Sequence, residues 1–247
     1  MTEHEQHSSA QSLVQLPAGA SWSAYFDQLA FSSKDQRLQR FYSAGTMTDE
    51  TTIANTPMVA LDFETTGLDA DSDEIVSIGI VPFSLQRIFC NESRHWLVKP
   101  RAELAQDSVV IHNITHSAIS SAPDLELILD EVLSILAGRL CVVHYHPIER
   151  EFIARALYNR IQESIVFPVV DTMQLEMQII HKQQTIMGKL FNRSLPSLRL
   201  DDCRRRYHLP YYQAHHALTD ALATAELLQA QIRHHFSAET TVAELWL

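Results

Sequence analysis

The chain has 247 residues, a formal net charge of −11 and 46% hydrophobic residues. This length and apolar content suffice for one large or two small domains with a buried core, and they exclude a wholly disordered chain. The negative charge argues against a protein that coats nucleic acid by charge alone. No apolar run approaches the length of a membrane span, and residues 1–9 lack the basic region and apolar core of a signal peptide.

The three cysteines are far apart in the sequence, and none belongs to a Cys-x-x-Cys pair: Cys90, Cys141 and Cys203. This spacing argues against a disulfide framework and against a thiolate zinc site. We therefore expect a reducing, cytoplasmic location, in which all three cysteines are buried structural thiols.

Charge is unevenly spread along this acidic chain. Seven basic residues and only two acids lie between Lys182 and Arg206. This basic segment is compatible with a local groove that binds phosphate, and equally with the solvated basic face of a helix.

The first 55 residues are predicted to form an extension. Residues 1–20 are polar and are expected to be disordered or loosely attached. Aromatic and aliphatic residues recur at helical spacing over residues 21–45, which predicts two short helices broken near Ser32 and Ser33. We expect these helices to pack on the main domain, with a partner-docking arm as the alternative. A polar linker over residues 46–56 closes at Pro57.

Three strands are predicted next. The apolar run over residues 58–61 stops at a Thr-Thr-Gly turn, residues 75–83 form a second strand, and residues 87–98 alternate well enough for a third, paired with the second. Residues 111–115 then mark a turn into a helix, for which Thr115 is a suitable N-cap.

Strands and helices alternate in the rest of the chain. The spacing of leucine, isoleucine and valine predicts a helix over residues 123–137, between Pro123 and Gly138. The elements expected after it are strands over 140–143 and 166–170, and helices that start near residues 148, 172, 194 and 217. This order predicts an α/β domain with a mixed sheet, antiparallel at its start and parallel afterwards.

Two acidic side chains stand at the carboxyl end of the first predicted strand. Because strand side chains alternate between faces, Asp62 and Glu64 point the same way while Phe63 points into the core. Two adjacent carboxylates suit a hard divalent cation such as Mg²⁺ or Mn²⁺. An exposed strand end with two solvated acids is the alternative.

Two later clusters carry further candidate ligands. Residues 144–152 follow a buried strand and open a helix, and residues 215–221 open the last long helix. Five helical positions would rotate Asp220 about 140° away from His215. The two converge only if His215 lies on the loop before that helix and Asp220 in its early turns.

These clusters resemble the DnaQ-like 3′–5′ exonucleases of the DEDDh type, over about residues 57–231. Residues 62–67 fit the family motif D-x-E-T-T-G, and residues 215–221 fit H-x-A-x-x-D-A. The middle motif, H-N-x-x-F-D-x-x-F, is represented in this chain by His144, Tyr145, Ile148, Glu149 and Phe152. Glu149 therefore stands where the family has its metal-binding aspartate.

The resemblance implies a ribonuclease H-like fold with a mixed sheet of about five strands over residues 56–236, followed by a tail over 237–247. It implies two Mg²⁺ or Mn²⁺ ions held by four carboxylates, Asp62, Glu64, Glu149 and Asp220, with His215 as the general base. It also implies substrate contacts at Thr65, Thr66, Gly67, Leu68, His144 and Phe152. The substrate would be a nucleic-acid 3′ end, with single-stranded DNA favoured and RNA as an alternative.

Several alternatives stay open. Glu149 is expected to bind metal; the alternative is a surface acid with a weakened or absent second metal site. His146 is expected to be a surface residue. A non-catalytic nucleic-acid-binding module on a decayed exonuclease fold and a phosphodiesterase of small nucleotides are competing functions. The enzyme would be a polymerase-proofreading subunit or act alone, with the N-terminal extension as a candidate site for a protein partner and no association with membranes. The apolar tail is expected to pack on its own domain.

Overall fold

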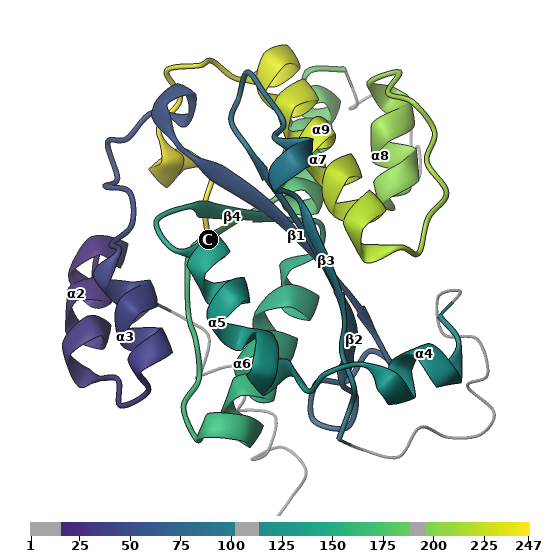
Figure 1. Ribbon diagram of the computed structural model, residues 1–247. Coiled ribbons are helices and arrows are strands. Elements are labelled where there is room, and N and C mark those ends of the chain that lie inside the picture. Colours follow the sequence, from purple (N-terminus) through teal and green to yellow (C-terminus); the bar gives the residue numbers. More distant parts are fainter. Residues whose placement is uncertain (1–15, 102–113, 188–195) are drawn as a thin grey trace, which may run out of the picture.

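The computed structural model describes residues 16–101, 114–187 and 196–247. Its centre is a five-stranded sheet in the order β3-β2-β1-β4-β5, which confirms the predicted mixed sheet (Figure 1). Strand β1 pairs antiparallel with β2 and parallel with β4, and β2–β3 and β4–β5 continue these two patterns. The strands are β1 (Met58–Thr65), β2 (Ile75–Phe83), β3 (Arg94–Leu97), β4 (Leu140–Val143) and β5 (Val169–Asp171).

Helices cover both faces of the sheet. One face packs against α2 (Trp22–Ser32), α3 (Gln36–Ser43), α5 (Leu125–Leu136) and α6 (His146–Ile161). The other face packs against α7 (Thr172–Met187) and α9 (Ala217–His235), with α8 (Leu200–Arg206) beside them. A short helix, α4 (His116–Ser121), begins after the N-cap Thr115, as predicted.

The alternation of β1 explains this layering. Val59, Leu61 and Phe63 are buried in the core that α5 and α6 share, whereas Met58 and Ala60 are buried in the core that α9 shares. Asp62 and Glu64 continue the second series, so both carboxylates lie on the α9 side of the sheet.

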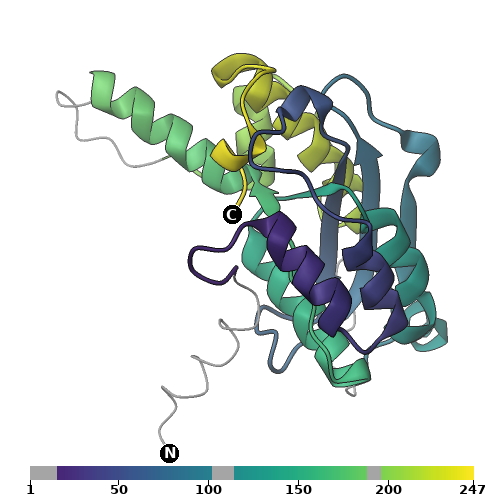
Figure 2. The same ribbon diagram turned by 90° about the vertical axis from the view of Figure 1, so that its left-hand side faces the viewer.

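The two N-terminal helices pack on the main domain, as predicted. Trp22, Phe26, Phe41 and Tyr42 are buried in the same core cluster as β1 and α5, and the Val166 N–H donates a hydrogen bond to the Tyr42 hydroxyl. Figure 2 shows α2 and α3 on the side of the molecule that α5 and α6 occupy. The core therefore runs without a break across the predicted boundary near residue 55. The predicted disorder of residues 1–15 lies outside the described residues.

The end of the chain also packs on its own domain, as predicted. Val242 and Leu245 are buried, and Trp246 forms a β-bridge to Val170 beside β5. The Arg150 guanidinium donates to the carbonyl of Leu247 at 2.6 Å, which ties this end of the chain to α6.

Three predicted elements are shorter than expected. The strand predicted over 87–98 starts only at Arg94, because a 3₁₀ turn at Cys90–Glu92 interrupts it. The strand predicted over 166–170 starts at Val169, since Pro168 has no N–H for the ladder. The helix predicted over 194–207 starts at Leu200, because Arg199 is extended and the Leu198 carbonyl accepts from His144 instead.

The cysteine prediction is wrong at one position. Cys141 and Cys203 are buried free thiols, whereas Cys90 is exposed on the 3₁₀ turn. Among the described residues, no helix is long and apolar enough to span a membrane.

Candidate active site

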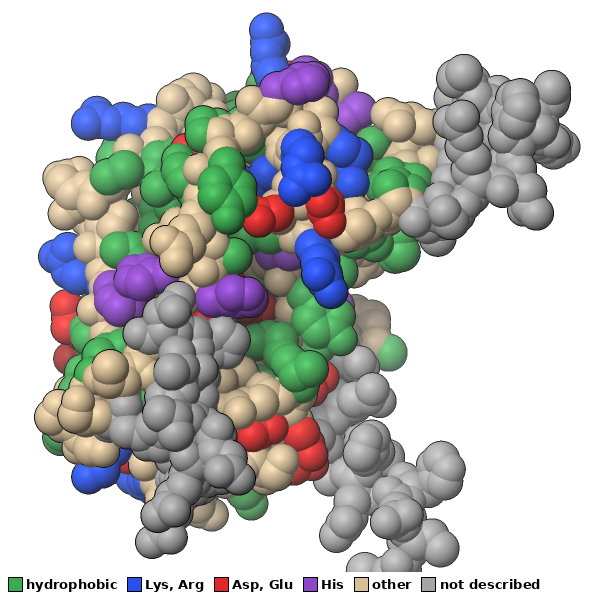
Figure 3. Space-filling view, turned by 90° about the vertical axis from the view of Figure 1, so that its right-hand side faces the viewer, with side chains coloured by type: hydrophobic (Ala, Val, Ile, Leu, Met, Phe, Trp, Pro, Cys, Tyr) green, Lys and Arg blue, Asp and Glu red, His purple; other side chains and the backbone are tan. Residues whose placement is uncertain are grey.

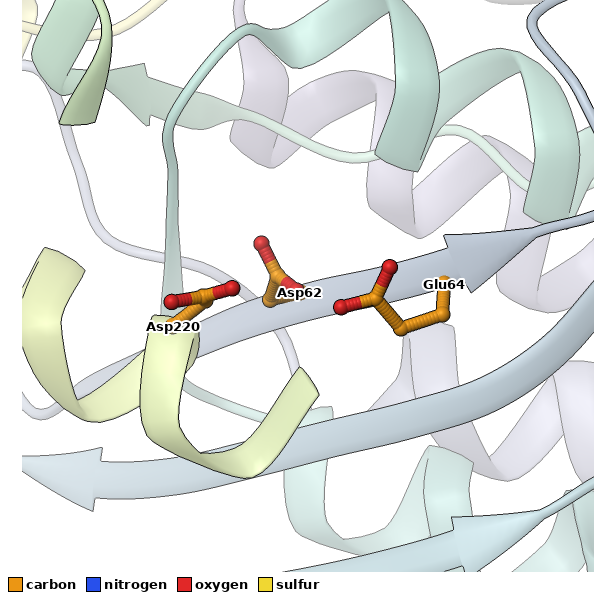
Figure 4. Close-up of side chains that lie close together, drawn as sticks. All are labelled: Asp62, Glu64 and Asp220. Carbon is orange, nitrogen blue, oxygen red and sulfur yellow. The ribbon is translucent and has the colours of Figure 1, made fainter. Parts of the chain in front are cut away.

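Three carboxylates meet over the sheet. Asp62 and Glu64 project from β1 towards Asp220 on the first turns of α9 (Figure 4). One ligand atom of each residue lies within 4.8 Å of the others. Spacing of this kind lets several carboxylate oxygens share one divalent cation or two adjacent ones.

A glycine lets α9 come this close. Gly79 lies opposite Asp62 in the β1–β2 pairing. A Cβ at residue 79 would lie 2.2 Å from the carbonyl carbon and oxygen of Ala217 and 2.4 Å from the backbone nitrogen of Leu218. Any side chain there would displace the start of α9, and with it Asp220. Sequence reasoning missed Gly79; an isolated glycine inside a strand pattern was its only signal.

The loop before α9 has the geometry that brings His215 and Asp220 together. His215 has a left-handed backbone with φ +69° and lies outside the helix, and His216 is the N-cap. The backbone N–H groups of His215 and His216 donate to Asp220 Oδ2, at 2.9 and 3.4 Å. The His215 residue and the Asp220 carboxylate are thus held together, as predicted.

Glu149 enters the site from the opposite face of the sheet. It lies in the first turn of α6, just past the point where the β1–β4 pairing ends at Ala60 and Val142. Glu149 is 2% exposed, which excludes a surface acid, and no described residue forms a hydrogen bond with its Oε2 atom. A buried, unpartnered carboxylate oxygen near Asp62 fits a cation ligand.

The electrostatics of the carboxylates favour the binding of a cation at this site. Burial raises the pKa of Asp62 well above its usual range, and the charges of Glu149, Asp220 and Glu64 raise it further. Burial also raises the pKa of Glu149, against backbone hydrogen bonds at Glu149 and Phe63 that favour its charged form. Burial raises the pKa of Asp220 as well. A divalent cation between these groups would reverse all three effects.

The start of α6 is held by Asp171, at the end of β5. The Asp171 carboxylate accepts hydrogen bonds from the N–H groups of Tyr145 and His146, and from His146 Nδ1 at 2.8 Å. It also caps α7 through the N–H groups of Met173 and Gln174, at the helix start that the sequence predicts near residue 172. His146 is partly exposed at the surface, as predicted, with 32% of its side chain accessible, and its ring also contacts this carboxylate.

Comparison with known proteins agrees with this geometry. A protein-family model described as exonuclease (RNase_T) matches residues 59–228. The chain belongs to this exonuclease family.

Two curated relatives of this chain are named as DNA polymerase III or as one of its subunits. It is 29% identical over 181 residues to the PolC-type DNA polymerase III of Thermotoga maritima, covering 73% of the chain but 12% of that protein. It is 27% identical over 176 residues to the DNA polymerase III subunit epsilon of Treponema pallidum, covering 71% of the chain and 76% of that subunit. It therefore spans about an eighth of the length of the PolC-type relative.

Solved structures with low sequence identity share the fold of this chain. Cell-death related nuclease 4 matches with a TM-score of 0.59 at 20% identity, over 72% of this chain and 64% of that one. The nuclease domain of 3′hExo, a DEDDh family member bound to rAMP, matches with a TM-score of 0.58 at 13% identity, over 76% and 96%. Exonuclease X in complex with 5′ overhanging duplex DNA matches with a TM-score of 0.53 at 19% identity, over 74% and 96%.

The turn after β1 contains the first group of predicted substrate contacts. The Thr66 hydroxyl donates to Asp73 Oδ1 at 2.9 Å, and Asp73 also accepts from the Asp69 N–H. A Cβ at Gly67 would lie 2.3 Å from Asp73 Oδ2, so a side chain there would displace the Asp73 carboxylate. Leu68 is 86% exposed at the tip. Sequence reasoning missed Asp73, which lies in the loop between the first two predicted strands.

The other two predicted substrate contacts lie inside the protein. His144 bonds through Nδ1 to the Thr172 hydroxyl at 2.8 Å and through Nε2 to the Leu198 carbonyl at 2.9 Å. Phe152 is 3% exposed and belongs to the core cluster of β1 and α6. As the molecule is folded here, both residues support the site from within.

The basic segment does not present all its charges to solvent. Arg204 is buried and bonds to the Ala223 and Pro210 carbonyls and to Glu226. Arg206 bonds to Glu176 at 2.7 Å. These two cations of the segment stabilise the packing of α8 against α7 and α9. The lysine at 189 and the arginine at 193 lie outside the described residues.

Proposed function

We propose that the protein is a metal-dependent 3′–5′ exonuclease. It hydrolyses the 3′-terminal phosphodiester of nucleic acid, with single-stranded DNA as the favoured substrate, and releases nucleoside 5′-monophosphates. The observation that carries this proposal is the carboxylate cluster: Asp62, Glu64 and Asp220 lie within 4.8 Å, and the buried Glu149 has an unpartnered oxygen. A decayed, non-catalytic module would have no reason to keep four carboxylates and a histidine in this arrangement.

The four carboxylates would hold two Mg²⁺ or Mn²⁺ ions, because all their donor atoms are oxygens. The charges of Glu149, Asp220 and Glu64 all act on the Asp62 carboxylate, so Asp62 would be the central ligand of the site. When bound, the ions supply Lewis acidity that makes an attacking water more acidic and offsets charge on the reacting phosphate.

The chain's own residues supply proton transfer and orientation. His215 would accept the proton of the attacking water, a task suited to an imidazole near neutral pH. Its left-handed loop and the hydrogen bond from its N–H to Asp220 set its position relative to the carboxylates. Backbone groups of Thr65 and Thr66 would meet the terminal 3′-hydroxyl, and the exposed Leu68 would wedge against the last base.

RNA is the second candidate substrate, favoured by one of the structural neighbours. The nuclease domain of 3′hExo binds rAMP and matches over 96% of its length. Exonuclease X and Escherichia coli exonuclease I, crystallised with DNA, support the first candidate. Polymerase III relatives make proofreading a candidate role, with a stand-alone enzyme as the alternative. A protein partner at the N-terminal extension stays a prediction.

The test uses 5′-labelled single-stranded DNA and RNA with Mg²⁺ or Mn²⁺. We expect a ladder that shortens from the 3′ end and is abolished by EDTA, by Asp62→Ala and by His215→Ala. Binding of either nucleic acid without cleavage under both metals would overturn the proposal, and the relative DNA and RNA rates decide between the two substrates.

A further inference from the structure

An open groove lies beside the candidate active site and includes His215 in its lining. Its volume is about 690 Å³, within the range of small-molecule sites. Residues of β3, of the start of α4 and of the loop before α9 line it, among them His95, Ile114, Thr115, Gln213, His215 and His216. Figure 3 shows histidine side chains gathered across the middle of this face.

The sheet register connects this groove to the carboxylates. Asp62 lies opposite Gly79, and Gly79 lies opposite His95, so the three residues form one row across β1, β2 and β3. Residues directly opposite each other in a sheet point to the same face. His95 is therefore two strand spacings, about 9.5 Å, from Asp62 on the active-site face.

The start of α9 fills the gap in the middle of this row. Because Gly79 has no side chain, the backbone of Ala217 and Leu218 rests on it. The residue before them, His216, thereby places its ring against that of His95, with ring centroids 4.6 Å apart and planes tilted by 35°. His95 Nε2 bonds to the Ser77 hydroxyl at 2.8 Å, and His216 Nδ1 to the Thr219 hydroxyl at 3.3 Å, so both rings are held in place.

The chemistry of the groove selects its occupant. Its described lining contains no Lys, Arg, Asp or Glu, so it offers no salt bridge to a phosphate or to a cationic ligand. Among the described residues, the carboxylate cluster is the one group of metal-ligating side chains, and the histidines of the groove do not belong to it. Two stacked, exposed imidazoles, an apolar floor and the Gln213 amide instead suit a flat heteroaromatic ring with polar edges.

We propose that this groove binds the nucleobase on the 5′ side of the scissile phosphate, stacked on the His95–His216 ring pair. This inference rests on the proposed exonuclease function. The terminal nucleotide is assigned to the turn after β1, whereas the groove is lined by β3 and by the loop before α9, so it takes the next nucleotide of the strand. His95 lies outside the motifs by which the chain resembles its family, and His216 occupies a variable position of one of them. Stacking selects for a base without reading its sequence.

The test compares two single-stranded DNA substrates that differ at the penultimate residue, which is thymidine in one and an abasic tetrahydrofuran in the other. The wild type should prefer the thymidine substrate by about tenfold in kcat/KM, mainly through KM. His95→Ala should abolish most of this preference, and His95→Phe should retain it. Both variants lose the hydrogen bond to Ser77, so a merely structural role of His95 would affect both alike.

Fluorescence anisotropy of the same two oligonucleotides in EDTA provides a readout that does not need catalysis. Phe31→Ala, at an exposed aromatic residue on α2, is the matched control and should leave the preference unchanged in both assays. Wild-type preference retained in His95→Ala would overturn the groove assignment while leaving the exonuclease intact. A His95-dependent preference in binding, without cleavage by the wild type under either metal, would support the groove and overturn the proposed function.

Discussion

The starts of α6 and α9 bring carboxylates to β1 from opposite faces of the sheet, and they do so differently. Asp220 on α9 accepts two hydrogen bonds from the N–H groups of the loop before it, which fix its carboxylate without a cation. Glu149 on α6 is more deeply buried and keeps one oxygen without a hydrogen-bond partner among the described residues. One ligand is therefore preorganised, while the other depends on a cation for compensation of its charge.

The two helix starts are also anchored differently. The first residues of α9 rest on the bare backbone of Gly79. The start of α6 instead follows Tyr145, whose φ of +86° is a left-handed conformation that costs about 1–2 kcal/mol for a residue with a side chain. Hydrogen bonds from Tyr145 and His146 to Asp171 offset this strain. Packing on Gly79 therefore positions the start of α9, whereas polar contacts with Asp171 position the start of α6.

The largest expected effect is at Glu149 itself. Glu149→Ala removes a cation ligand and should lower kcat by about 10³-fold or more, because several kcal/mol of charge stabilisation are lost. Glu149→Asp, which restores the family's usual residue, should keep activity within about tenfold of the wild type. Single-turnover cleavage of labelled DNA measures both. Wild-type rates in both variants would show that α6 contributes no ligand.

The second largest expected effect is a loss of activity in Gly79→Ala, which changes the packing of α9. The new Cβ would overlap the backbone of Ala217 and displace Asp220, and a misplacement of about 1 Å can cost about 100-fold in rate. Overpacking should also lower the free energy of unfolding by about 1–3 kcal/mol. The rate assay and thermal unfolding measure the two effects. A variant that retains the wild-type rate would contradict the role given to Gly79.

Removing the charge of Glu149 should stabilise the protein when no cation is bound. Its folded-state pKa is raised by burial, so the stability associated with this group is present below the usual carboxylate pKa and is lost as pH rises through the folded value. In EDTA, Glu149→Gln should raise the free energy of unfolding at neutral pH by about 1–3 kcal/mol and flatten its decline above about pH 4.5.

Saturating Mg²⁺ should reduce or reverse this difference between Glu149→Gln and the wild type, because only the wild type gains the full set of ligands. Thermal unfolding from pH 4 to 8, with EDTA and with Mg²⁺, measures this difference in the free energy of unfolding. An identical pH dependence of wild type and variant in EDTA would argue that folding does not raise the pKa of Glu149.

The smallest expected effect is at His146. His146→Ala removes the ring hydrogen bond to Asp171 but keeps both backbone hydrogen bonds, so we expect a loss of about 1 kcal/mol in the free energy of unfolding. Since Asp171 supports the helix start that carries Glu149, cation affinity should fall by about tenfold. Calorimetric titration with Mn²⁺ measures this, and an unchanged affinity would separate the His146–Asp171 contact from the site.

Local patterns predicted the regular elements well. The helices at 125–136 and 217–235 and the strands at 75–83 and 140–143 follow hydrophobic periods that are strong in the sequence. Predictions were wrong where a tertiary contact overrides the hydrophobic period of the sequence. The Leu198 carbonyl bonds to His144, so the chain before α8 stays extended, and Cys90 is exposed because a 3₁₀ turn interrupts its strand.

The sequence by itself determined the ligand set on β1 and α9 and the exonuclease resemblance, because motif spacing and strand alternation are local properties. Tertiary structure decided what depends on contacts between distant residues. These are the burial of Glu149 in the gap between β1 and β4, the approach of α9 over Gly79, and the row from Asp62 to His95. No period along the chain encodes such contacts, since strand pairing and helix packing bring those residues together only in the folded protein.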